Sequence, residues 1–119
     1  MVRAVVVCCE KIRDRICMGC ARCFKALSLK AGKFGEFNDV QIVAWTSCGG
    51  CPGLVVPKMN NLNLVLKQID VEYDVVFIAS CIVKAVKTGN CKIDLEKLAK
   101  DIEDEVGKKV VIGTKPPEI

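Results

Sequence analysis

Four short, mostly apolar runs rich in β-branched residues are spaced along the chain. They cover residues 2–7, 40–46, 75–80 and 110–113. An apolar run of this length, without polar alternation, is typical of a strand covered on both faces, as in a parallel sheet. The pattern therefore predicts four buried strands.

Helical patterns separate these runs. We expect helices over residues 20–31 and 95–106, ended by Gly32 and Gly107. Asp94 is a suitable N-cap for the second of them. A further helix is predicted over residues 54–69, where Pro57 is tolerable in the first turn. Residues 81–87 predict one short helical turn, and residues 33–39 a loop.

Strands alternating with helices predict an α/β fold, a doubly wound parallel sheet of about four strands. Right-handed crossovers favour the flavodoxin-like, or Rossmann-like, strand order 2-1-3-4. The chain has 119 residues, 51% of them hydrophobic, which suits a single domain over residues 1–119 with its own core.

Hydropathy and charge exclude several classes of protein. No apolar run has the length of a membrane span, and the first run is too short for a signal peptide, so we expect a soluble, cytoplasmic protein. The net charge of +4 comes from scattered Lys and Arg, and there are only six aromatic residues. This composition does not suggest a nucleic-acid-binding face.

Cysteine is the unusual component of the sequence, with nine residues and no histidine. The odd count, the apolar content and the absence of a secretion signal argue against a disulfide scaffold. The lack of histidine excludes His-based acid–base catalysis, Ser-His or Cys-His nucleophiles and mixed Cys/His zinc sites. All-sulfur metal ligation is the chemistry that remains best supported.

The predicted topology brings the cysteines to one edge of the sheet. Cys8 and Cys9 end the first strand, Cys48 and Cys51 follow the second, and Cys81 follows the third. Adjacent parallel strands are about 4.8 Å apart, so three strand ends lie within roughly 10 Å. This carboxyl edge is where open α/β sheets bind ligands.

Two local motifs strengthen this expectation. The C-x-x-C-x-x-C run over residues 17–23 is typical of iron–sulfur ligation, with Cys9 or Cys91 as candidates for a fourth ligand. In Cys48-Gly-Gly-Cys51, the glycines permit a tight turn, and a following helix N-terminus favours thiolate. A strand, a C-x-x-C motif and a helix are also the thioredoxin arrangement, so a redox interpretation stays open.

The predicted metal ligands are therefore eight of the nine cysteines: Cys9, Cys17, Cys20, Cys23, Cys48, Cys51, Cys81 and Cys91. Cys8 should point to the opposite face from Cys9, so it is as easily a core residue as a ligand. Cys91 could equally be a loop cysteine without a role. Ser80 has no base beside it and is expected to be a hydrogen-bonding group at a strand end. Trp45 is expected to cover the sheet or shield the site.

The segment Ser47-Cys-Gly-Gly-Cys-Pro-Gly53 resembles the signature of the CGGC domain family of archaea and bacteria, whose members are regarded as metal binders. An apolar strand ending in Cys9, Cys23-Phe-Lys-Ala opening a helix, and Ala-Ser-Cys81-Ile are similar too. The resemblance implies ligand roles for Cys9, Cys17, Cys23, Cys48, Cys51, Cys81 and Cys91. Cys8 and Cys20 look like additions. The family is rich in histidine, which this chain lacks, and the resemblance implies a site without implying a reaction.

Four functional hypotheses follow. The leading one is a cysteine-ligated iron–sulfur cluster, with 4Fe-4S favoured, used for electron transfer, cluster or sulfur handling, or redox sensing. It implies a redox or cluster-transfer protein as partner. The alternatives are a structural or sensory zinc site, a thiol–disulfide oxidoreductase that uses Cys48 and Cys51, and an enzyme with an open iron position on its cluster.

Overall fold

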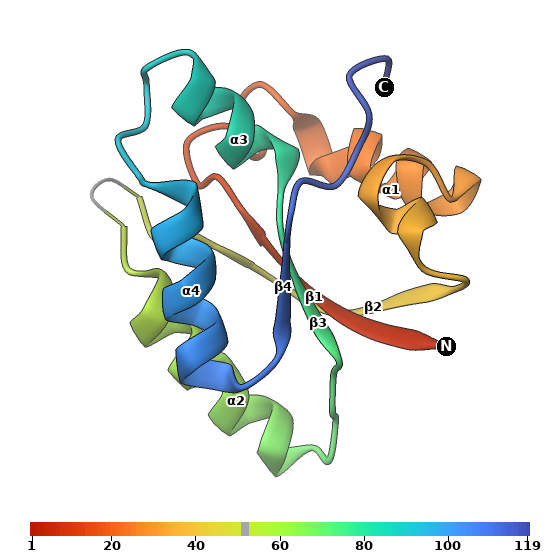
Figure 1. Ribbon diagram of the computed structural model, residues 1–119, viewed down its shortest axis with the longest axis vertical. Coiled ribbons are helices and arrows are strands. Elements are labelled where there is room, and N and C mark those ends of the chain that lie inside the picture. The colour runs from red at the N-terminus through yellow and green to blue at the C-terminus, as the bar shows by residue number, and fades with distance from the viewer. Residues whose placement is uncertain (51–52) are drawn as a thin grey trace.

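The computed structural model describes residues 1–50 and 53–119 and confirms the predicted α/β fold (Figure 1). The four strands are β1 (Val2–Cys8), β2 (Val40–Ser47), β3 (Val75–Ile78) and β4 (Lys109–Ile112). They form one parallel sheet in the order β2-β1-β3-β4. The predicted strand order 2-1-3-4 is therefore confirmed.

The helices are α1 (Ala21–Leu29), α2 (Val55–Gln68), α3 (Ser80–Lys87) and α4 (Leu95–Val106). Asp94 caps α4 as expected, because its carboxylate accepts hydrogen bonds from the backbone N–H groups of Glu96 and Lys97. Gly107 ends that helix in the left-handed conformation with φ of 70°. No helix in the described ranges is long and apolar enough to cross a membrane.

Three local predictions need correction. The first helix begins at Ala21, not at residue 20, because Gly19 and Cys20 adopt positive φ values of 60° and 55° at the end of a 3₁₀ turn over Met18–Cys20. It ends at Leu29, since Lys30 is left-handed, and not at Gly32. The predicted loop 33–39 contains a 3₁₀ helix over Gly32–Glu36, and α3 is longer than the single turn expected.

Helices cover both faces of the sheet, as a doubly wound fold requires (Figure 1). Side chains of α2, α3 and α4 pack on one face of β1, against Val5 and Val7. On the other face, Ala4 and Val6 pack with α1 and with Phe34, whose ring meets Phe77 edge-on at 4.9 Å between centroids. The alternation of β1 thus separates two apolar cores.

Alternation also separates the two cysteines at the end of β1, as the sequence predicts. Cys8 joins the core on the α1 face, and Cys9 joins the core on the α2 and α4 face. Both are buried, with 1% and 8% of their surface exposed. The end of β1 therefore presents sulfur on both sides of the sheet.

Candidate metal centre

A pocket of about 660 Å³ lies at the carboxyl edge of the sheet. Its walls come from the end of β1 and the turn after it, the start of α1, Trp45 of β2 and the residue after that strand, helix α3 and the loop that follows it, and the C-terminal tail. All eight cysteines in the described part of the chain line it: Cys8, Cys9, Cys17, Cys20, Cys23, Cys48, Cys81 and Cys91. Cys51, the remaining predicted ligand, lies outside the described residues.

Short backbone and side-chain contacts hold several of these cysteines in place. The Cys9 N–H donates a hydrogen bond to Cys81 Sγ over 3.1 Å, which joins the end of β1 to the first turn of α3. The Cys48 N–H donates to the Cys8 carbonyl over 2.9 Å and thereby continues the β1–β2 pairing by one residue. Cysteines far apart in the sequence are thus fixed beside one another by the sheet itself.

The sulfurs surround the pocket without converging on a single point. In residues 1–50 and 53–119, no three cysteine, aspartate or glutamate side chains are close enough together to hold one metal ion. Tetrahedral zinc requires sulfurs about 3.8 Å apart, since its Zn–S bonds are about 2.3 Å. The described cysteines therefore line the pocket without bringing three sulfurs together at one such site.

Burial raises the thiol pKa at several of these positions, because a thiolate is costly in apolar surroundings. The pKa of Cys81 rises to about 12 and that of Cys20 to about 11. The pKa values of Cys8, Cys9 and Cys23 are raised for the same reason. These five thiols are neutral at pH 7 in the metal-free protein, so a metal must displace their protons in order to bind.

The charged residues that line the pocket are all cationic. They are Lys11, Arg13, Arg22, Lys84, Lys87 and Lys115, and no aspartate or glutamate lines it in the described ranges. Thiolates without carboxylate or imidazole suit zinc, copper(I) or iron–sulfur clusters, whereas magnesium, calcium and manganese prefer oxygen. The donor set thus fits a soft metal centre that carries net negative charge.

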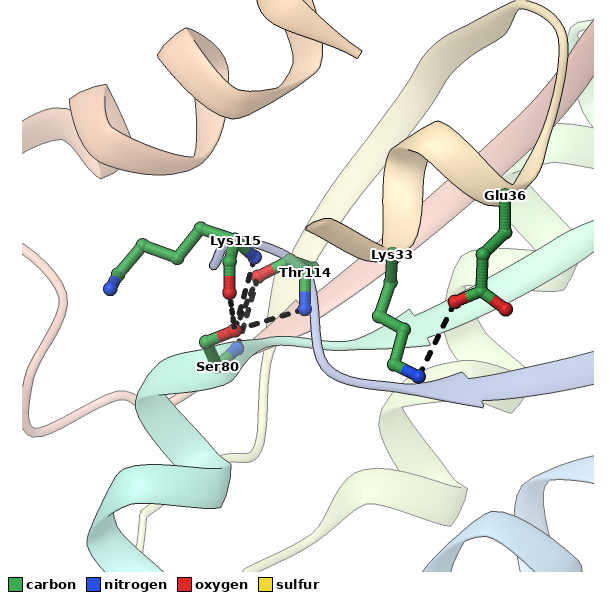
Figure 2. Close-up of polar contacts among 5 residues, drawn as sticks. All are labelled: Lys33, Glu36, Ser80, Thr114 and Lys115. Atoms are coloured by element: carbon green, nitrogen blue, oxygen red, sulfur yellow. Dashed lines mark hydrogen bonds and ion pairs between the residues drawn. The ribbon is translucent and has the colours of Figure 1, made fainter. Parts of the chain in front are cut away.

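Ser80 is a hydrogen-bonding group, as predicted (Figure 2), but it is the first residue of α3, because β3 ends at Ile78 and not at residue 80. Its hydroxyl accepts hydrogen bonds from the backbone N–H of Thr114 over 2.9 Å and of Lys115 over 3.1 Å, and donates to the Lys115 carbonyl over 3.2 Å. Thr114 Oγ1 in turn lies 3.3 Å from Cys23 Sγ. This network ties the C-terminal tail to α3 and α1, and so builds one wall of the pocket.

The sequence did not single out Thr114, Lys115 or Arg13 as residues of the site. Thr114 is fully buried, yet it follows β4 as an isolated polar residue before a Pro-containing tail. Its contact with Cys23 spans 91 positions. Only the tertiary arrangement reveals these residues, because no local motif surrounds them.

The redox interpretation concerns Cys48 and the helix that follows it. Helix α2 begins at Val55, with Leu54 as its N-cap, and the Leu54 N–H donates a hydrogen bond to the Cys48 carbonyl over 2.7 Å. Cys48 is only 4% exposed, which leaves little access for a protein disulfide. Activation of the Cys48-Gly-Gly-Cys51 motif by the helix N-terminus stays a prediction, since Cys51 lies outside the described residues.

The fold and the pocket define a class: a small parallel α/β domain with a cysteine-lined pocket at its carboxyl edge. The model of the CGGC domain family matches residues 3–115, and the chain belongs to that family. Membership confirms the resemblance seen in the sequence and implies metal binding. An uncharacterised protein of Methanocaldococcus jannaschii is 30% identical over 117 residues, which cover 95% of this chain and 86% of the relative. No solved structure matches.

Proposed function

We propose that this pocket holds an iron–sulfur cluster, bound through cysteine sulfur alone, which serves in electron transfer or in cluster handling. The observation that carries the proposal is the gathering of all eight described cysteines around one pocket without a carboxylate. Iron–sulfur clusters are held by cysteine thiolates. A zinc site is the alternative with the same ligands.

The cysteine spacing favours a cluster over a single ion. The C-x-x-C-x-x-C run over residues 17–23 is typical of iron–sulfur ligation. All three of its cysteines line the pocket, together with Cys9 and Cys91, the candidates for a fourth ligand. The motif and the position of its cysteines at the pocket therefore support a cluster.

The cationic lining also fits this proposal. Several thiolates around iron and sulfide leave net negative charge, which is costly in a partly apolar pocket. Of the six lining cations, only Arg13 is within 4.0 Å of a carboxylate in the described chain, at 3.8 Å from Asp14. The others are available to offset the charge of the centre.

The same cations suggest the chemistry of a partner. Lys11, Lys84 and Lys87 are exposed at the pocket, and the apolar side chain of Ile16 beside them is 74% exposed. An acidic redox or cluster-transfer protein would be steered toward such a surface by long-range attraction. The residues of this chain would hold the metal centre and limit its contact with water. The partner would approach the pocket from the side where the exposed lysines lie.

Anaerobic purification tests the proposal. The wild-type protein should be brown and should contain iron and acid-labile sulfide in a fixed ratio to protein. A variant with Cys17, Cys20 and Cys23 all changed to Ser should lose most of this iron. The control is Ser28→Ala, on the exposed surface of α1, which should load as the wild type does. A colourless protein with stoichiometric zinc would overturn the iron–sulfur proposal in favour of zinc.

A further inference from the structure

Two buried N–H groups beside the pocket have no hydrogen-bond acceptor. They are Arg13 Nε and Trp45 Nε1, and they are the unpartnered buried side-chain nitrogen and oxygen atoms found in residues 1–50 and 53–119. A buried donor without an acceptor loses its hydration and gains nothing in return. Such a pair at one site indicates that an acceptor belongs there.

Both groups belong to the surroundings of Cys8. Trp45 is on β2, paired with Val6 of β1, and its side chain packs on the same core as Cys8. Its ring stacks on Phe24 of α1 at 5.0 Å between centroids, which holds the indole in place. Arg13 is in the turn after β1, where its backbone N–H donates to the Cys9 carbonyl over 2.9 Å. Arg13, Trp45 and Cys8 all line the pocket.

The protein atoms nearby do not complete these donors. Asp14 Oδ2 is 3.8 Å from Arg13 Nε, which is too long for a hydrogen bond. Asp14 is also engaged elsewhere, because its Oδ1 accepts from the Gly19 N–H over 2.8 Å. Trp45 and Arg13 lie close enough to Cys8 to lower its pKa. As a neutral thiol, however, Cys8 is a weak acceptor, and it makes no hydrogen bond of satisfactory geometry to either N–H group. A metal-bound thiolate is a much stronger acceptor.

We propose that Cys8 is a ligand of the metal centre and that Trp45 Nε1–H and Arg13 Nε–H donate hydrogen bonds to its bound sulfur. This inference rests on the proposed metal centre and adds a ligand that family resemblance did not imply. Trp45 and Arg13 are positioning residues, since they act on the centre through Cys8. Each exchanges an unpaired N–H for a charge-assisted hydrogen bond when the sulfur is metal-bound.

The donors have a predictable electronic effect. Hydrogen bonds to a cluster sulfur stabilise the more negative, reduced state and so raise the reduction potential. Removing one of them should shift the potential of the loaded protein to a more negative value. Trp45→Phe keeps the ring and removes the N–H, and Arg13→Lys keeps the charge and removes Nε.

The experiment uses the full chain loaded anaerobically with iron and sulfide. Trp45→Phe and Arg13→Lys should keep the wild-type iron content and show more negative potentials in voltammetry, while Cys8→Ser should lower the iron content or the retention of iron against a chelator. Ser28→Ala is the control, because it changes the exposed face of α1 and leaves both N–H donors and the Phe24 ring in place. Its potential should stay near that of the wild type. Trp45 is the only tryptophan, so its fluorescence in the wild type should be quenched on loading.

The outcomes separate this inference from the proposed function. If wild-type protein takes up no iron and sulfide, the cluster proposal fails, and the same variants are then compared with Co²⁺ bound. In that case the Cys8→Ser variant should show weaker sulfur-to-cobalt charge-transfer absorption, and the loss should equal the contribution of one thiolate ligand. Unchanged potentials in Trp45→Phe and Arg13→Lys, or unchanged metal content and absorption in Cys8→Ser, would overturn the role given to Cys8 and its two donors.

Discussion

At the scale of single residues, the pocket depends on groups of two kinds. Most of the pocket cysteines could be predicted from the sequence, because they end or follow strands or belong to a C-x-x-C motif. The groups that contact these cysteines could not be predicted. Thr114 reaches Cys23 across 91 positions only through the tertiary fold, and Arg13 comes close to Cys8 through the turn after β1, which carries no motif.

Ser80 provides a residue-scale prediction. Ser80→Ala removes the acceptor for the backbone N–H groups of Thr114 and Lys115 and leaves them poorly satisfied at a part-buried site. We expect a loss of about 2 kcal/mol in the free energy of unfolding, measured by urea denaturation. The control is Ser28→Ala, whose hydroxyl bonds only its own exposed helix at Phe24. Equal stability of the two variants would contradict the structural role of Ser80.

At the scale of elements, the strands were predicted more accurately than the turns between them. Apolar runs locate strands because burial on both faces leaves little choice of residue. The start of α1 was missed because Cys20 adopts a left-handed conformation, which the C-x-x-C-x-x-C pattern does not reveal. Gly32 was expected to end that helix. In the structure, its backbone instead lies directly against the backbone of the C-terminal tail.

Gly32 provides the element-scale prediction. It has a φ of 62°, and a Cβ there would meet the Thr114 carbonyl oxygen and lie 2.9 Å from Lys115 C. Gly32→Ala should therefore cost about 3 kcal/mol in the free energy of unfolding, from backbone strain and displacement of the tail. Chemical denaturation measures this loss.

Gly107→Ala is the matched control for that measurement. Gly107 has a similar φ of 70°, but no atom lies within 4 Å of a Cβ placed there. Only the left-handed backbone cost of about 1 kcal/mol is expected. If the two alanine variants lose the same free energy of unfolding, the contact between Gly32 and the tail does not contribute to stability.

At the scale of the whole molecule, the two cores include the pocket residues Cys8 and Cys9 but extend well beyond the pocket. Most of the packing on the two faces of the sheet comes from aliphatic and aromatic side chains, such as Val5, Met59 and Phe77. The chain is also long enough to support such a core without a metal. This distinguishes it from zinc fingers, which are unfolded without their metal.

We therefore expect the metal-free protein to remain folded. After chelation under reducing conditions at pH 7, far-UV circular dichroism should keep its helical signal and thermal unfolding should stay cooperative, at a lower temperature. Hydrogen exchange should accelerate in residues 9–20 and 88–93, which line the pocket outside the long helices, and much less in β1 and β3. Loss of the cooperative transition on chelation would show that the metal is part of the core.

The sequence alone determined the parallel α/β fold, the strand order and the edge of the sheet where the cysteines gather. It did so because buried strands and their crossovers impose a repetitive pattern, and because parallel strands end on the same side. The tertiary structure alone decided which side chains lie beside these cysteines, among them Trp45 from β2 near Cys8 and Thr114 after β4 against Cys23. These features depend on side-chain contacts between residues distant in sequence, which no local pattern encodes.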